Sequence, residues 1–269
     1  MPMLERNDQG AVAYLTMNSP GNLNALSNAM IAALQAEFDA LAQDRSIRAV
    51  VLSGAGKAFC AGHDLKEMTR ARDDADGGRA AFDDLFARCS NMMQSILRLP
   101  QPVIAKVHGI ATAAGCQLVA TCDMAIAAEG TKFGVNGVNI GLFCSTPMVA
   151  LSRNIPRKQA FEMLTTGSFI DATRAAELGL INRSVAPENL DRETTELAES
   201  VASKLGHAVK IGKRAFYEQL QMPLDQAYAH TGQVIAENMM HAQTQKGIAA
   251  FIDKREPEWD QDDTKSPND

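Results

Sequence analysis

The chain has 269 residues, 46% of them hydrophobic and 22% charged, which is the composition of an ordinary globular protein with one large core. Its formal net charge of −6 excludes a broad basic footprint for nucleic acid. No apolar run approaches the roughly 20 residues of a membrane span, and the polar start MPMLERNDQG predicts no secretory signal. The five cysteines lack C-x-x-C or His spacing, which predicts reduced thiols, a cytoplasmic location and no metal site.

The chain opens with a predicted strand and a predicted helix. Residues 11–17 have the pattern of a strand, and a turn rich in Pro, Gly and Asn follows over 19–26. Ser27 is the predicted N-cap of a helix over about 28–43. One face of this helix carries apolar side chains at helical spacing: Met30, Leu34, Phe38 and Leu41.

Strands and helices continue to alternate up to about residue 140. Further strands are predicted over 48–56, 102–109 and 123–129. Loop 57–68 enters a short helix, a long amphipathic helix covers about 80–98, and small residues over 111–122 lead into another helix. The charged stretch 70–80 predicts a mobile surface segment, and its position after the loop makes it a candidate lid.

This alternation predicts an α/β fold with parallel strand pairs. From about residue 147 the pattern is almost entirely helical. We therefore predict a core over residues 1–195, a helical C-terminal region over 196–258 and a disordered polar tail over 259–269.

Two segments share a design that suits a negatively charged oxygen. Segment 59–64 leaves a strand, turns at Gly62 and starts a helix, and segment 112–117 does the same through small residues. A helix N-terminus carries unpaired N–H groups and a partial positive charge. Two such donors at one oxygen form an oxyanion hole, which stabilises the enolate or tetrahedral oxyanion of a thioester. Each segment alone could equally be a tight turn, so the pair carries the argument.

These segments resemble the enoyl-CoA hydratase/isomerase, or crotonase, superfamily. The resemblance runs from about residue 4 to about residue 256 and rests on PGNLNALS, AFCAGHDLKEM, VIAKVHGIATAAGCQLVATCDMAIAAEGTKFG, VNIGLFCST and FIDKREPEW. Within the superfamily, ATAAGCQLVATCD and VNIGLFCSTP are similar to the enoyl-CoA hydratase domain-containing protein 3 subgroup. The resemblance implies a spiral of ββα turns with a helical C-terminal trimerisation region, and a homotrimer or a hexamer. It also implies an acyl-CoA thioester as ligand, with coenzyme A as part of the substrate and no other cofactor.

By the same resemblance, the two oxyanion-hole donors fall on the N–H groups of His63 and Ala114. The coenzyme A portion would contact Leu23, Ala25, Ala61, Gly62, Asp64 and Leu65. Lys66, Lys254 and Arg255 could meet a phosphate of coenzyme A, although exposed charges are more often only solvated.

A hydratase of this family activates water with two glutamates, one as base and one as acid. The matching positions here hold Gln117, three residues after Ala114, and Gly137. An amide exchanges no proton at neutral pH, and glycine offers no side chain. The position of an acid used by some isomerases holds Ser145. The sequence therefore predicts a carbonyl-binding site without the proton-transfer groups of a hydratase.

Two titratable side chains remain near this site. The His63 imidazole could take part in catalysis or simply pack, and Cys144 could be a nucleophile or a small buried apolar residue. His108 and Asp123 are predicted to have structural roles. Three functions stay open: altered hydratase or isomerase chemistry of the lyase class, another thioester reaction such as decarboxylation or hydrolysis, and non-catalytic acyl-CoA binding.

Overall fold

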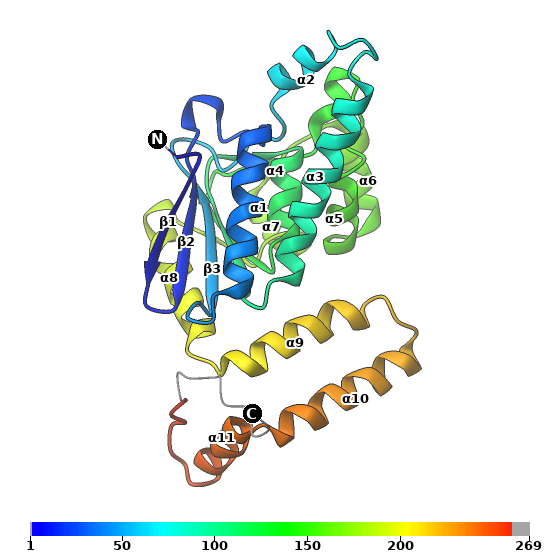
Figure 1. Cartoon of the computed structure of the whole chain (residues 1–269). Coiled ribbons are helices and arrows are strands. Elements are labelled where there is room, and N and C mark those ends of the chain that lie inside the picture. The colour runs from blue at the N-terminus through cyan, green and yellow to red at the C-terminus, as the bar shows by residue number, and fades with distance from the viewer. Residues whose placement is uncertain (1, 260–269) are drawn as a thin grey trace.

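The structure is a computed structural model that describes residues 2–259. Figure 1 shows a body of strands and helices, below which the C-terminal helices extend as a separate layer. The strands are β1 (Leu4–Gln9), β2 (Val12–Met17), β3 (Ala49–Gly54), β4 (Val103–Val107), β5 (Ile110–Thr112), β6 (Met124–Ala128), β7 (Lys132–Gly134), β8 (Ile170–Asp171) and β9 (Arg183–Val185).

Helices surround these strands. The helices of the body are α1 (Asn28–Gln43), α2 (Leu65–Ala71), α3 (Arg79–Arg98), α4 (Ala114–Thr121), α5 (Pro147–Asn154), α6 (Arg157–Thr166), α7 (Ala172–Leu178) and α8 (Leu190–Ala202), with the 3-10 helices η1 (Pro20–Asn22), η2 (Asn136–Ile140) and η3 (Pro187–Asn189). The C-terminal layer, called the arm below, consists of α9 (Gly206–Gln219), α10 (Leu224–Met240) and α11 (Ala242–Ile252).

The chain winds between two sheets. One has the strand order β1-β2-β3-β4-β6-β9 and the other β5-β7-β8. Twice in succession the chain places one strand in each sheet and then turns into helix: β4, β5 and α4, followed by β6, β7 and the segment that leads to α5. From β2 to β9 the large sheet pairs in parallel, which requires such crossovers. The predicted α/β spiral is confirmed.

The sequence pattern missed β1, which pairs antiparallel with β2 at the edge of the large sheet. Its sequence, LERNDQ, is polar and mostly exposed. An edge strand that is not covered gains nothing from apolar side chains, so the alternation that marks a half-buried strand is absent. The predicted strand over 11–17 corresponds to β2.

The predicted helix over 28–43 is α1, with the predicted bounds. The hydroxyl oxygen of Ser27 accepts a hydrogen bond from the Met30 N–H at 3.2 Å, so Ser27 is the N-cap. The predicted apolar face is buried, together with one further residue: Met30, Ile31, Leu34, Phe38 and Leu41. This face packs toward α3 and the large sheet, which fixes α1 on the body.

The stretch 70–80 is more structured than predicted. Its first residues end α2, and α3 begins at Arg79. The carboxylate of Asp76 accepts hydrogen bonds from the N–H groups of Gly78 and Ala80, both at 2.9 Å, and so caps the start of α3. The acidic residues that suggested a mobile surface segment therefore include a helix cap.

The predicted boundary at residue 195 falls inside α8. This helix packs on the large sheet through Ala198 and Ala202, beside Val51 and Ile104. The layer that leaves the sheet begins at α9. Of the predicted tail, Trp259 donates its indole N–H to the carbonyl of Ser203 at 3.0 Å, and residues 260–269 lie outside the described residues.

A buried ionic cluster attaches the arm to the body. Nζ of Lys213, on α9, donates to two backbone carbonyls of the body at 2.8 and 2.9 Å and pairs with Asp123 at 2.7 Å. Asp123 also accepts from the Val103 N–H and from the Tyr217 hydroxyl, both at 2.7 Å. The structural role predicted for Asp123 thus consists of joining the start of β4 to α9.

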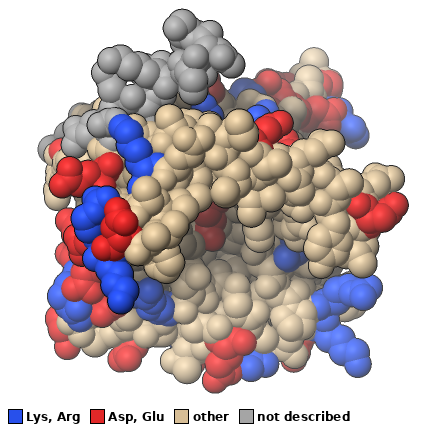
Figure 2. All heavy atoms as spheres, turned by 90° about the horizontal axis from the view of Figure 1, so that it is seen from below, with Lys and Arg blue, Asp and Glu red and all other residues tan. Residues whose placement is uncertain are grey.

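The arm leaves many large apolar side chains exposed: Phe216, Leu220, Leu224, Tyr228, Ile235, Met239, Met240, Phe251 and Ile252. Figure 2 shows this side of the molecule from below, where residues other than Lys, Arg, Asp and Glu cover the middle and charged ones gather toward the edges. Along residues 2–259, no helix is both long and apolar enough to cross a membrane.

Candidate functional site

The two predicted donor segments lie side by side. Cys60 and Ala111 form a parallel bridge, and the Thr112 N–H donates to the Cys60 carbonyl at 3.0 Å. A Cβ atom built on Gly62 would lie 3.3 Å from the amide nitrogen of Ala114. The backbone of the first segment is therefore in contact with the backbone of the second.

Unusual backbone angles turn both segments into their helices. Gly62 has a φ of 90°, which favours glycine. Ala113 has a φ of 50° and a ψ of −118°, directly before α4 begins. Such strain costs on the order of 1–3 kcal/mol and persists only where the surroundings enforce it. Gly115 supplies that close packing, since a Cβ there would lie 2.2 Å from the Cys60 carbonyl oxygen.

The amide groups of His63 and Ala114 are both free. Among the described residues, neither N–H donates a hydrogen bond to a protein atom. Ala114 is the first residue of α4, where an N–H has no acceptor within the helix. It is also buried, and a buried N–H without an acceptor is uncommon. Two neighbouring donors without acceptors suit an anionic or carbonyl oxygen.

The loop between β2 and α1 forms one wall of this site. The Ala61 N–H donates to the carbonyl of Leu23 at 3.0 Å, and the Leu26 N–H donates to the carbonyl of Gly62 at 2.7 Å. The structure thus brings Leu23 and Ala25, predicted to contact coenzyme A, next to two other residues of that predicted set.

The sequence predictions missed Asn24, which fixes the shape of this loop. Asn24 is fully buried and has a φ of 53°. Its Nδ2 donates to the carbonyls of Ala55 and Ala58, both at 2.8 Å, and its Oδ1 accepts from the Ser19 N–H at 2.9 Å. The available signal was an asparagine inside a turn, because this residue adopts left-handed conformations more readily than most.

Asp64 has a clear local role as the N-cap of α2. Its carboxylate accepts from the N–H groups of Lys66 at 2.8 Å and Glu67 at 3.2 Å, and from the Asn22 side chain at 2.7 Å. Burial alone would raise the pKa of Asp64, but these hydrogen bonds outweigh it and lower the pKa. The cap starts α2 so that Leu65 and Lys66 are exposed.

The His63 imidazole packs at the inner side of α3. Its ring meets Phe86 edge-on with centroids 5.5 Å apart, and Nδ1 lies 3.4 Å from the carbonyl of Leu26. A carbonyl only accepts, so in the neutral ring Nδ1 carries the proton and Nε2 is left as an acceptor. Nε2 is buried without a hydrogen-bond partner among the described residues. Burial lowers the pKa of His63, which keeps the ring neutral at physiological pH.

Gln117 and Gly137, the two positions predicted to match the family glutamates, lie beyond the Ala114 segment. Gln117 is 7% exposed, and its side-chain oxygen has no partner within the described residues. Gly137 is buried in η2, which is tied to β5 because the Thr112 hydroxyl donates to the Asn136 side chain at 2.6 Å. Cys144 lies beside Gly137, and burial raises the pKa of its thiol, so the thiol stays protonated.

Lys254 is not brought to this site within one chain. It follows α11, which lies at the bottom of the view in Figure 1, whereas α2 lies at the top. His108 contacts the Gly56 carbonyl through Nε2 at 2.9 Å, in agreement with its predicted structural role. The described residues hold no group of three or more His, Cys, Asp or Glu side chains arranged to bind a metal ion.

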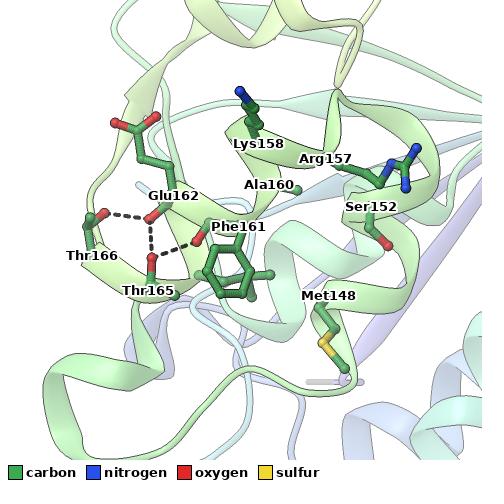
Figure 3. A pocket seen from close by; sticks show the side chains of 10 residues that line it. Met148, Ser152, Arg157, Lys158, Ala160, Phe161, Glu162, Thr165 and Thr166 are labelled. Atoms are coloured by element: carbon green, nitrogen blue, oxygen red, sulfur yellow. Dashed lines mark hydrogen bonds between the residues drawn. The ribbon is translucent and has the colours of Figure 1, made fainter.

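Two hollows lie outside the donor segments. One, of about 210 Å³, is lined by Asn28 of α1, Met68 of α2 and Phe82 of α3, next to the stretch 70–80. The other, of about 690 Å³, lies over α5 and α6 (Figure 3). The exposed Phe161 lines it, and so do several polar or charged side chains of α5 and α6, but no residue predicted for the site does.

Comparison with known proteins agrees with this geometry. The α/β spiral is shared with a crystal structure of an enoyl-CoA hydratase from Mycobacterium smegmatis, which is 53% identical with a TM-score of 0.93, over 96% of this chain and 99% of that one. It is shared too with human enoyl Coenzyme A hydratase domain-containing protein 3, which is 40% identical with a TM-score of 0.91, over 96% of this chain and 100% of that one. The spiral is thus the crotonase fold.

The sequence comparisons assign the family. The sequence model of the protein family described as enoyl-CoA hydratase/isomerase matches residues 7–262 of this chain. The rat protein called enoyl-CoA hydratase domain-containing protein 3, mitochondrial, is 43% identical over 251 residues, which is 93% of this chain and 82% of the relative. The chain belongs to the enoyl-CoA hydratase/isomerase family, and the predicted resemblance to the domain-containing protein 3 subgroup is confirmed.

Proposed function

We propose that this protein binds an acyl-CoA thioester and stabilises an enolate or oxyanion at its carbonyl with the N–H groups of His63 and Ala114. The observation that carries the proposal is the pair of adjacent amides without acceptors, one of them buried at the start of α4. Such donors cost no reorganisation when charge develops on the oxygen. Family membership supports a thioester as the source of that oxygen.

The coenzyme A portion would lie along the β2–α1 loop and the start of α2. The loop and the 61–64 segment are already hydrogen-bonded to each other, which supports a preformed surface. Its residues are those predicted: Leu23, Ala25, Ala61, Gly62, Asp64, Leu65 and Lys66. Lys254 follows α11, which lies on the far side of the molecule from α2 (Figure 1). Its proposed contact with a phosphate of coenzyme A therefore requires the Lys254 of a second copy of the chain.

The proposal does not include efficient hydration. If Gln117 and Gly137 stand at the positions of the family glutamates, the site lacks both proton-transfer groups, each of which typically contributes 10²–10⁴-fold. The neighbouring groups are an amide, a neutral imidazole and a protonated thiol. We therefore propose that the binding half of a hydratase site is retained without its proton-transfer half.

A second candidate is another thioester reaction, such as decarboxylation or hydrolysis. The specific observation in its favour is Nε2 of His63, a buried acceptor without a partner among the described residues. A neutral acceptor of this kind could receive a hydrogen bond from a substrate or a water molecule. Turnover of a thioester panel that disappears in His63→Gln while binding persists would favour this candidate over non-catalytic binding.

We also propose that the protein assembles as a homotrimer or as a hexamer. The exposed apolar side chains of the arm support this, because single chains rarely leave such a surface uncovered. Light scattering during size-exclusion chromatography measures the mass directly. A monomer at micromolar concentration would contradict the proposal.

The compartment stays a prediction. Buried cysteines without disulfides agree with a reducing environment, while the named rat relative is called mitochondrial. Localisation of a tagged protein in its own cell distinguishes the two.

The decisive experiment removes one proposed donor without changing a side chain. Replacing Ala114 by lactic acid converts its N–H into an ester oxygen. We expect the affinity for an enolate-mimicking acyl-CoA analogue, measured by calorimetry, to fall by about 10²-fold, in line with the loss of one oxyanion-hole donor. The same replacement at Ala172, the first residue of α7, is the matched control and should leave affinity unchanged.

Two outcomes would contradict the proposal. The first is the absence of binding of any acyl-CoA at millimolar concentration to the unaltered protein. The second is equal binding by the ester at Ala114 and the ester at Ala172. Robust hydration of crotonyl-CoA that is lost in Gln117→Ala would show instead that proton transfer does not need the carboxylates.

A further inference from the structure

Two glycines of one loop are constrained in different ways. Gly141 has a φ of 77°, and a Cβ built on it meets nothing within 4 Å, so its constraint is conformational. Gly137 has no positive φ, so its backbone suits any residue. A Cβ on Gly137 would instead lie 2.3 Å from the carbonyl oxygen of Leu142 and 2.9 Å from Sγ of Cys144. The constraint at Gly137 is therefore space alone.

The loop creates this crowding by folding back on itself. The Leu142 N–H donates to the Gly137 carbonyl at 3.0 Å, and the Gly141 N–H donates to the Val138 carbonyl at 3.1 Å. These bonds close the turn that holds the Leu142 carbonyl over Gly137. The obstructing atom belongs to the backbone, so no side-chain rotation makes room for a larger residue. The hydrogen-bonded turn itself would have to open.

This loop stands next to one of the proposed donors. The Ala113 N–H donates to the Gly134 carbonyl at 2.9 Å, and the Thr112 hydroxyl reaches Asn136. The strand that leads to Ala114 and the strand that leads into η2 are thus neighbours in the small sheet. Burial, together with the nearby Cys144, raises the pKa of Cys116 to about 12. Neither thiol supplies an ionised group beside the donor.

We propose that the loop from Gly137 to Cys144 closes the side of the site where a second carboxylate would be needed, and so excludes the acid that hydration of a double bond requires. The inference rests on the proposed acyl-CoA function. Addition of water to the β-carbon needs a positioned proton-transfer group. This wall offers a carbonyl oxygen, which carries no proton, and a protonated thiol. Substrates are therefore thioesters whose reaction needs stabilisation of an enolate or oxyanion but no carboxylic acid at this wall, which leaves out hydration of a double bond.

The test attempts to restore the carboxylates. Gln117→Glu, Gly137→Glu and the double variant are compared for hydration of crotonyl-CoA. An open site would gain at least 100-fold in the double variant over the unaltered protein, since two general acid-base groups would return. We expect no such gain. A 100-fold increase would overturn the inference.

Crowding at Gly137 can be measured through thermal stability. Gly137→Ala should lower the melting temperature by about 5 °C or more, because one methyl group meets a backbone oxygen. Gly21→Ala is the matched control, since a Cβ there meets nothing within 4 Å and its φ is not positive. The loss should persist in a Cys144→Ala background, where the thiol is gone but the carbonyl remains. An unchanged melting temperature for Gly137→Ala would show that the loop has room for a side chain at position 137, against the inference.

A further readout uses the unaltered protein and does not depend on any variant folding. Iodoacetamide labelling of Cys144, followed by mass spectrometry, should be at least 100-fold slower than in urea-unfolded protein. Labelling within tenfold of the unfolded rate would mean that the loop is open, against the inference. Calorimetry with acyl-CoA on the unaltered protein tests the proposed function separately, because absent binding would reject that function. The melting temperatures and the labelling rates test whether the loop from Gly137 to Cys144 is closed.

Discussion

The body buries a large apolar core, whereas the arm leaves most of its large apolar side chains exposed. In the body, Phe38, Phe59 and Phe133 are fully buried. In the arm, Tyr228 is 73% exposed and Phe251 is 82% exposed. A body that closes its own core can hold strained backbone such as that before α4, whereas the arm has apolar surface that only another surface can cover. The two donor segments are thus assembled within one chain, while the exposed apolar surface of the arm supports the proposed assembly.

The largest expected effect comes from breaking the join between the two regions. Lys213→Met leaves Asp123 charged and buried, which costs about 3–5 kcal/mol. Burial lowers the pKa of Lys213, but its pairing with Asp123 and two carbonyls holds the ammonium in place. Urea unfolding at fixed protein concentration measures the loss. Lys210→Met, on the exposed face of the same helix, is the control and should change stability by less than about 0.5 kcal/mol. Equal losses of stability for both substitutions would mean that the ion pair between Lys213 and Asp123 does not hold the arm to the body.

A pair of glycine substitutions sharpens the contrast in packing. Gly115→Ala in the body places a methyl group 2.2 Å from a carbonyl oxygen and should cost about 1–3 kcal/mol. Gly232→Ala in the exposed middle of α10 meets nothing and should stabilise the helix by about 0.5–1 kcal/mol. Thermal unfolding compares the two directly. A neutral Gly115→Ala would mean that the donor helix is not tightly packed.

Polar substitution in the arm tests whether its exposed surface is an interface. Tyr228→Ser with Phe251→Ser should raise the dissociation constant of the assembly by about tenfold or more, since buried aromatic residues dominate interface energies. The far-ultraviolet circular dichroism should not change, because neither side chain packs in the body. Light scattering over a dilution series gives the constant, with Phe251→Leu as the conservative control. An unchanged mass at every dilution would remove the arm from the interface.

The smallest effect is a pH dependence inside the body. The pKa of His63 is lowered from 6.5 by burial, so below pH 6.5 the unfolded chain takes up a proton that the folded chain resists. Stability should therefore fall as the pH falls from 6.5 toward the folded pKa, and level off beneath it. Urea unfolding of the unaltered protein and of His63→Gln between pH 7.5 and pH 5 checks this, because these values lie about 1 unit above and about 1.5 units below the ordinary His pKa. Identical slopes would indicate that the ring is not desolvated.

Most of the secondary structure could be predicted from local sequence patterns. The Ser27 cap and the apolar face of α1 could be predicted because each depends on residues that are neighbours in sequence: a cap at most one turn from the N–H it binds, and apolar side chains repeated every three or four residues. β1 was not readable, since an exposed edge strand has no burial to select its side chains. The cap formed by Asp76 was hidden in an acidic run that equally suits a solvated loop.

Sequence alone was enough to identify the two small-residue segments, the residues at positions 117 and 137, neither of which is a glutamate, and, through resemblance, the family. The three-dimensional contacts were needed to show that a Cβ on Gly62 would lie 3.3 Å from the Ala114 amide nitrogen and that Asn24 ties the loop beside them. These contacts join residues far apart in the chain, where no short pattern records which partner is met. The same reason hid the separation of Lys254 from the site, because the arm is attached to the body through an ion pair between Lys213 and Asp123, two residues far apart in the chain.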